Sequence, residues 1–133
     1  MMKSEELAIF KDELIKNLNN SHSPYLKYNV SALLFTEKGV FKGVNIEDGV
    51  HGVCAERSAF ASAISAGDKS FKKMFVAAKK AGSDSLDGDV VPCGYCLQFL
   101  SEFVDGSFPI YVFGNDEVKI YTFEELLPYS FKR

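Results

Sequence analysis

Three cysteines and one glutamate are the residues of this sequence whose types and spacing could carry out metal chemistry. Cys54 begins the segment Cys-Ala-Glu-Arg, and Cys93 and Cys96 both lie in Pro-Cys-Gly-Tyr-Cys. Three thiolates match the ligand count of an open, catalytic zinc site, whereas a closed structural site normally takes four ligands. Glu56 follows Cys54 closely, which would hold a carboxylate beside the open coordination position. The pattern predicts a zinc ion and a proton-transferring carboxylate in one site.

Three other interpretations of these residues remain open at the level of sequence. His51 precedes Cys54 by three residues and could complete a closed structural zinc site. The second pair of cysteines could be a thioredoxin-like redox pair, although that interpretation leaves Cys54 and Glu56 unexplained. Glu56 could also be an ordinary acidic residue in the first turn of a helix. We prefer the catalytic interpretation because it accounts for all of these residues together.

Both cysteine segments are predicted to begin helices, and this placement favours metal binding. Helix N-termini carry partial positive charge and unpaired amide donors, which favour the thiolate over the thiol. Zinc held by three thiolates has a net negative charge, so it is a weaker Lewis acid than zinc held by histidines, and neighbouring groups must draw charge from the sulfurs. Arg57, next to Glu56, is the candidate donor of a hydrogen bond to a sulfur.

The elements that must position these residues follow from the pattern of apolar side chains, which alternates between helical and strand spacing. We expect a single domain over residues 1–133 with an α/β fold, a three-layer α/β/α sandwich around a five-stranded mixed sheet. The predicted elements are a helix over 4–18, strands over 28–35 and 40–45, a helix over 54–66, a strand over 73–78, a helix from 93 that ends at 106, strands over 109–113 and 118–121, and a short helix between 122 and 128.

Local signals predict several of the element ends. Ser4, followed by two acidic residues, predicts the start of the first helix, and Gly67 predicts the end of the second. Thr122 and Glu125 have the spacing of a capping box. Small side chains dominate the second helix, which lets it pack closely against a sheet or another helix. Residues 82–89 are predicted to form a polar loop, the most mobile internal segment.

Composition and charge exclude several classes of protein. With 133 residues and 47% hydrophobic residues, the chain can bury a core without disulfides, so a disordered or fibrous protein is excluded. The net charge of −3 and the isolated basic pairs at 72–73 and 79–80 argue against nucleic-acid binding and favour a small, uncharged substrate. No apolar run has the length of a membrane span or the features of a signal peptide, so we expect no membrane partner and a cytoplasmic location with reduced thiols.

The motifs, taken in order, resemble those of small, homotetrameric zinc-dependent cytidine deaminases. Cys-x-Glu followed by Pro-Cys-x-x-Cys is a form of the zinc deaminase signature. The other matching segments extend the resemblance over the length of the chain: Pro24-Tyr25, Asn45-Ile46-Glu47 and Glu125-Leu126-Leu127-Pro128. Apart from the two zinc-binding segments, no single segment is specific for this family, but the set of segments in this order is highly specific.

The resemblance implies a hydrolase that converts cytidine and 2′-deoxycytidine to uridine and 2′-deoxyuridine with release of ammonia, in pyrimidine salvage. Zinc bound by the three cysteines would activate a water for attack on C4 of the cytosine ring. Glu56 would accept the water's proton, protonate ring N3 and then protonate the leaving amino group. The resemblance also implies a homotetramer with active sites at the subunit interfaces.

The resemblance further implies a set of substrate contacts. Asn45 and Glu47 would bind a ribose hydroxyl, and the Ala55 backbone would contact the amide edge of the base. Tyr28 would pack on the base, and Phe131 would reach in from a neighbouring subunit. The alternatives are strand-end capping for the two polar side chains and core packing for the two aromatic ones.

Three departures from the family pattern bear on the substrate. Position 28 is tyrosine where phenylalanine is usual, so its hydroxyl needs a partner. Leu97 stands where arginine is common, which leaves more of the charge neutralisation to Arg57. The loop between Asn45 and Cys54 is shorter than is typical and resembles that of blasticidin S deaminases. The alternatives are therefore a deaminase of another cytosine-containing compound, such as blasticidin S, and, from another class, a non-catalytic zinc-stabilised domain.

Overall fold

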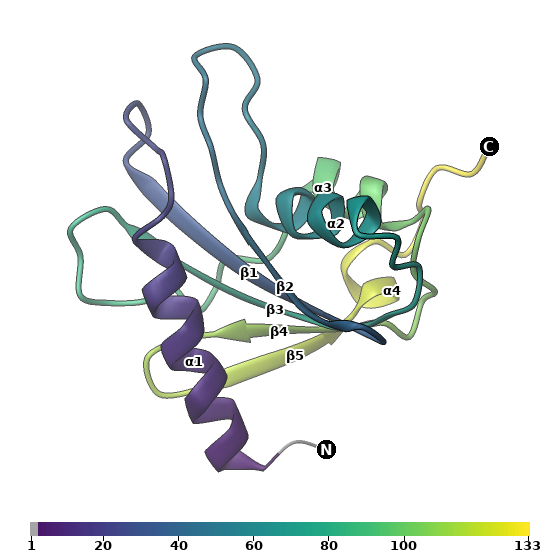
Figure 1. The fold of residues 1–133 in the computed structure, drawn as a ribbon, viewed down its shortest axis with the longest axis horizontal. Coiled ribbons are helices and arrows are strands. Elements are labelled where there is room, and N and C mark those ends of the chain that lie inside the picture. Colours follow the sequence, from purple (N-terminus) through teal and green to yellow (C-terminus); the bar gives the residue numbers. More distant parts are fainter. Residues whose placement is uncertain (1–2) are drawn as a thin grey trace.

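A computed structural model describes residues 3–133, and a five-stranded mixed sheet lies at their centre (Figure 1). The strand order is β2-β1-β3-β4-β5. Strands β3 and β4 run parallel, and the other neighbouring pairs are antiparallel. The strands are β1 (Tyr28–Thr36), β2 (Gly39–Val44), β3 (Phe71–Lys80), β4 (Pro109–Phe113) and β5 (Val118–Thr122). The predicted five-stranded mixed sheet is confirmed.

Helices cover both faces of this sheet, which gives the three layers predicted from the sequence (Figure 1). The long helix α1 (Ser4–Leu18) packs on one face. Three shorter helices pack on the other face: α2 (Ala55–Ser65), α3 (Gly94–Leu100) and α4 (Phe123–Leu126). No helix in residues 3–133 combines the length and apolar character needed to cross a membrane.

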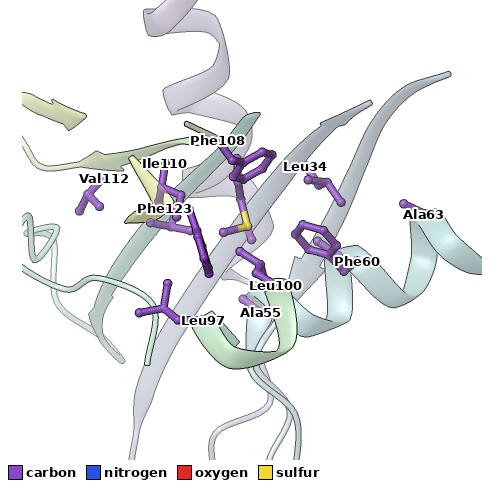
Figure 2. Packing of buried hydrophobic residues seen from close by; sticks show 14 residues of the cluster. Leu34, Ala55, Phe60, Ala63, Leu97, Leu100, Phe108, Ile110, Val112 and Phe123 are labelled. Atoms are coloured by element: carbon purple, nitrogen blue, oxygen red, sulfur yellow. The ribbon is translucent and has the colours of Figure 1, made fainter. Parts of the chain in front are cut away.

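The central strands β1 and β3 are buried on both faces because their successive apolar side chains point to opposite layers. Leu33 and Phe75 face α1, where they pack with its buried Leu14. The neighbouring residues of the same strands face α2 and α3, where the other half of the core forms around Phe60 (Figure 2). Leu34, Met74 and Val76 belong to that half.

Gly43 on β2 lets the first turn of α2 lie directly on the sheet. A Cβ atom added to Gly43 would come within 2.2 Å of the Ala55 carbonyl oxygen and 2.4 Å of the Ala59 nitrogen. Both contacts are to backbone, which cannot rotate away as a flexible side chain would. The glycine therefore sets the depth at which α2, and with it the segment that begins at Cys54, sits on the sheet.

Several element ends differ from the sequence-based predictions. Helix α3 ends at Leu100, and turns replace the predicted helix up to residue 106. Strand β3 extends beyond both ends of the predicted 73–78, because antiparallel pairing with β1 continues from Phe71 to Lys80. Lys3 occupies the position before α1 and no side chain caps that helix. By contrast, the predicted capping box of α4 is confirmed, and Gly67 follows α2 with the positive φ of 86° expected of a C-terminal glycine.

Candidate metal centre and active site

The sulfur atoms of Cys54, Cys93 and Cys96 converge at one point between α2 and α3. All three lie within 4.8 Å of one another, and the sulfurs of Cys54 and Cys93 are 3.8 Å apart. Among residues 3–133, these three cysteines form the cluster of three or more side chains that could bind one metal ion. His51 does not belong to the cluster. The closed structural site that would need His51 is therefore not formed.

The three sulfurs fit a zinc ion. Two sulfurs bound to one tetrahedral zinc, each at ~2.3 Å, lie about 3.8 Å apart, which is the separation of the Cys54 and Cys93 sulfurs. Thiolates are preferred zinc ligands, and three of them leave one tetrahedral position for water or substrate. The donor set and the separation of the Cys54 and Cys93 sulfurs both match an open zinc site.

Helix starts position the ligands, as the sequence predicts. Cys54 precedes the first residue of α2, and Cys93 precedes the first residue of α3. The Cys93 sulfur also accepts a hydrogen bond from the backbone N–H of Cys96 at 3.5 Å, so it caps the helix that carries the third ligand. Free backbone donors in the first turns of both helices therefore surround the cluster with partial positive charge.

Hydrogen bonds within the cluster shift the pKa values of Cys54 and Cys96 in opposite directions. A hydrogen bond from Cys96 lowers the pKa of Cys54 to about 5, and Arg57 lowers it further against an opposing effect of burial. The same hydrogen bond to Cys54, with burial, raises the pKa of Cys96. These opposite shifts favour the thiolate at Cys54, which is the form of cysteine that binds a metal ion.

Arg57 contacts the cluster, as the sequence predicts. Its Nη2 atom lies 3.6 Å from the Cys54 sulfur, and its guanidinium carbon lies 4.1 Å from the centre of the Tyr95 ring. Its Nε atom is buried without a hydrogen-bond partner among the described residues. Although burial opposes it, the bonds to Cys54 and Cys96 raise the pKa of the guanidinium. Arg57 is therefore a fixed positive charge against the ligands.

Glu56 is buried in the first turn of α2, with 5% of its surface exposed. Burial raises its pKa to about 7, with a smaller contribution from the negative charge of Cys54 and an opposing one from Arg57. A carboxyl group with this pKa can both accept and donate a proton near neutral pH. An ordinary first-turn acid would lie exposed in solvent, so burial beside the sulfurs favours the catalytic interpretation.

Asn45 and Glu47 fasten the end of β2 to neighbouring backbone. The Asn45 amide group donates to the Tyr28 carbonyl at 2.7 Å and accepts from the Val30 N–H at 2.8 Å. The Glu47 carboxylate accepts from the N–H groups of Tyr25 and Leu26 at 2.9–3.3 Å. Both side chains therefore have the strand-end role considered in the sequence analysis. Each side chain can still form further hydrogen bonds, because an amide group can form four and a carboxylate can accept about as many.

The hydroxyl of Tyr28 has the partner that the sequence analysis required. It donates to the carboxylate of Asp87 at 3.0 Å, and burial together with this bond raises the pKa of Tyr28 to about 12. Asp87 belongs to the polar loop over residues 82–89, so the pair ties this loop to the start of β1. No motif in the sequence identified Asp87, because the contact joins positions that are distant along the chain.

Ala55 and Phe131 lie in very different surroundings. Ala55 is the first residue of α2 and is fully buried. The Phe131 side chain is 69% exposed, so it does not pack in the core of its own chain. Its backbone instead forms two hydrogen bonds with the side chain of Gln98 on α3. No signal in the sequence singled out Gln98 or Tyr95, although both lie in or next to the second cysteine motif.

Comparison with known proteins gives a family match. A family model described as the cytidine and deoxycytidylate deaminase zinc-binding region matches residues 4–112, which include the three cysteines and Glu56. The chain is 37% identical to a cytidine deaminase of Sporosarcina psychrophila over 122 residues, 89% of this chain and 85% of that protein. It is 35% identical to a blasticidin-S deaminase of Bacillus cereus over 113 residues, 80% of this chain and 79% of that protein.

Solved structures agree with the sequence comparison. The crystal structure of a cytidine deaminase from Burkholderia pseudomallei superposes on this chain with a TM-score of 0.81 and 27% sequence identity. The match covers 98% of this chain and 100% of that one. The whole fold is therefore shared, including the helices that carry the cysteines.

Proposed function

Because the chain belongs to the cytidine and deoxycytidylate deaminase family, we propose that it hydrolyses cytidine and 2′-deoxycytidine to uridine and 2′-deoxyuridine, with release of ammonia. The observation that carries the proposal is the position of Glu56, buried next to three convergent cysteine sulfurs with a pKa of about 7. A zinc-stabilised domain without activity has no need of a buried carboxyl group there.

Cys54, Cys93 and Cys96 would hold the zinc ion, which would supply the Lewis acidity that a water molecule needs for attack on C4 of the cytosine ring near neutral pH. Glu56 accepts the proton of the attacking water and delivers it to ring N3. Glu56 then transfers the hydroxyl proton of the resulting tetrahedral carbon to the amino group. The C4–N bond breaks, ammonia leaves and the C4 carbonyl forms, so all atoms and protons are accounted for.

The charge around the cluster supports this chemistry. Three thiolates and one divalent cation together carry a net negative charge, which opposes the ionisation of water. Arg57, at 3.6 Å from the Cys54 sulfur, and the first turns of α2 and α3 offset that charge. Leu97 is buried and apolar, so it cannot offset the negative charge. Arg57 is therefore the side chain that does so.

We assign the substrate contacts to residues around the same end of the sheet. Asn45 and Glu47 bind the ribose with the hydrogen-bonding capacity that their backbone contacts leave free. The Ala55 backbone contacts the amide edge of the base, and the Tyr28 ring, held by Asp87, packs on its face. Phe131 acts from a neighbouring subunit, because its own chain leaves this residue 69% exposed. This assignment requires a homo-oligomer, for which we propose a tetramer.

The partner of the site is then a small nucleoside, in agreement with the net charge of −3, which does not favour binding to nucleic acid. A cytoplasmic location fits the site, because zinc-binding thiols stay reduced in that compartment.

The test is an ultraviolet deamination assay with cytidine, 2′-deoxycytidine, cytosine, dCMP and blasticidin S, run with the wild type and Glu56→Gln. We expect the highest kcat/KM with the two nucleosides. The relative from Bacillus cereus makes blasticidin S the second candidate, and a preference for it would correct the substrate while leaving the reaction intact. If no cytosine compound is deaminated by protein that holds about one zinc per chain, the catalytic proposal is wrong.

A further inference from the structure

One side chain of α3, the helix that begins directly after Cys93, forms hydrogen bonds with the C-terminal tail. Gln98 Nε2 donates to the Phe131 carbonyl oxygen at 3.0 Å, and the Phe131 N–H donates to Gln98 Oε1 at 3.0 Å. Within residues 3–133, these two bonds are the hydrogen bonds that link the segment 128–133 to the rest of the chain. The segment itself is neither helix nor strand.

The pair of bonds determines the orientation of Phe131. An amide side chain that uses both its N–H and its oxygen on one residue resembles the backbone of an adjacent β-strand. Both backbone polar groups of Phe131 are occupied, which restricts φ and ψ of that residue and hence the direction of its Cα–Cβ bond. The ring is directed outward, 69% exposed, while the backbone is fixed to α3.

Gln98 is itself held in place by its own helix. Its Nε2 atom lies 3.2 Å from the hydroxyl of Ser101, which in turn donates to the Gln98 carbonyl at 2.5 Å. Gln98 is half-buried and lies two positions after Cys96, a ligand of the cluster. The clamp formed by Gln98 and Phe131 therefore has a fixed place relative to the metal centre of its own chain.

We propose that Gln98 is a positioning residue that presents the Phe131 ring to the substrate site of a second copy of this chain. The inference rests on the proposed function, since it takes from there the role of Phe131 across a subunit interface. Gln98 touches neither substrate nor metal in this scheme. It limits the freedom of the tail before a second copy is met, so that less conformational entropy is lost when the ring closes on the base.

The chemistry of the clamp requires an amide. Glutamate has the same length and shape, but its carboxylate can only accept hydrogen bonds. In Gln98→Glu the bond from the Phe131 N–H can persist, whereas the bond to the Phe131 carbonyl is replaced by repulsion between two oxygen atoms. Gln98→Ala removes both bonds. Glu102→Gln is the matched control, because Glu102 is exposed and lies in the turn just after α3.

The experiment compares these three variants with Phe131→Ala and with the double variant Gln98→Ala/Phe131→Ala. Hydrogen–deuterium exchange of the C-terminal peptide reports the clamp, and steady-state kinetics with cytidine reports its effect on the substrate. We expect faster exchange at Phe131 and a KM about tenfold higher in Gln98→Ala and Gln98→Glu, the scale on which one or two neutral hydrogen bonds shift an equilibrium. We expect kcat within about twofold of wild type, because the proton-transfer machinery is unchanged.

The double variant separates positioning from a general structural role. If Gln98 acts through Phe131, the double variant has the KM of Phe131→Ala alone, and all variants keep the zinc content and thermal midpoint of the wild type. Unchanged exchange in Gln98→Ala, an unchanged KM, or additive effects in the double variant would each overturn the inference while wild-type activity upholds the proposed function. If wild-type protein loaded with zinc does not deaminate cytidine, the proposed function fails and this inference fails with it.

Discussion

The substitution Glu56→Gln tests the chemistry most directly, because it removes proton transfer and keeps the shape of the side chain. Glu56 is 5% exposed, so a shorter residue would leave a cavity and confuse two effects. Glutamine fills the same space, cannot exchange a proton near neutral pH, and leaves the three sulfurs untouched. We expect about one zinc ion per chain and an unchanged fold.

The loss of activity can be estimated from the number of proton transfers that Glu56 performs. A well-placed general acid or base contributes about 10²–10⁴ in rate, and Glu56 acts both when water attacks and when ammonia leaves. We therefore expect kcat to fall by at least about 10⁴, which corresponds to ~5.5 kcal/mol of transition-state stabilisation. KM should change little, since the neutral glutamine can still hydrogen-bond the base.

Although Glu56→Gln lowers activity, we expect it to raise the stability of the zinc-free protein at alkaline pH. Burial raises the pKa of Glu56 from 4.5 to about 7, so the folded state holds its proton more tightly than the unfolded state. The stability linked to this group is present below pH 4.5 and is lost as pH rises through 7. The loss is about 3 kcal/mol at pH 8 and about 1 kcal/mol at pH 5. Glutamine does not titrate, so Glu56→Gln should gain stability relative to wild type at pH 8.

Three measurements decide the outcome: loss of cytidine absorbance for kcat, metal analysis for zinc content, and urea unfolding of chelator-treated protein at pH 5 and pH 8. A kcat within tenfold of wild type in zinc-loaded Glu56→Gln would refute the role of Glu56 as proton carrier. A stability difference between variant and wild type that is equal at both pH values would refute the assignment of the raised pKa to Glu56.

Three further substitutions test the surroundings of the site. Arg57→Gln should lower kcat or speed the loss of zinc to a chelator by about tenfold or more, because Leu97 supplies no second charge; equal zinc retention and equal kcat would contradict this. Gly43→Ala should destabilise the protein by about 2–4 kcal/mol in urea unfolding, because its Cβ atom would lie 2.2 Å from the Ala55 carbonyl oxygen; a loss below ~1 kcal/mol would show that α2 shifts freely. Tyr28→Phe should keep kcat and speed hydrogen exchange in the loop over residues 82–89, since the bond to Asp87 is lost; unchanged exchange would show that Tyr28 does not hold the loop.

The convergence of the three cysteines, the position of Glu56 beside them and the layered fold were predictable from the sequence because each depends on local spacing. Cys54 and Cys93 both precede helices, and the thiols carry specific chemistry, so few arrangements could use them. The apolar runs of β1 and β3 likewise indicate strands that are covered on both faces. The predicted end of α3 is too late because Phe103 follows Phe99 at helical spacing, although the backbone after Leu100 forms turns.

The contacts that orient the site were not predictable, because they join residues that are far apart in the sequence. Asp87 reaches Tyr28 across 59 positions, and Gln98 reaches Phe131 across 33. Tyr95 occupies the variable position of the second cysteine motif, and nothing in its spacing indicates that Arg57 lies against its ring. Hydrogen bonds and stacking of this kind follow from the packing of the whole chain rather than from any periodic pattern.

The arrangement of the ligands means that a bound metal ion would also stabilise the fold, because it would cross-link distant parts of the chain. Cys54 and Cys93 belong to different helices and are separated by 39 positions, so an ion that binds both closes a loop of that length. Cross-linking a loop of this size in the unfolded chain is worth about 4 kcal/mol in the chain-entropy model. Chelation would therefore do more than abolish turnover, because it would also remove this contribution and lower the free energy of unfolding of the whole chain.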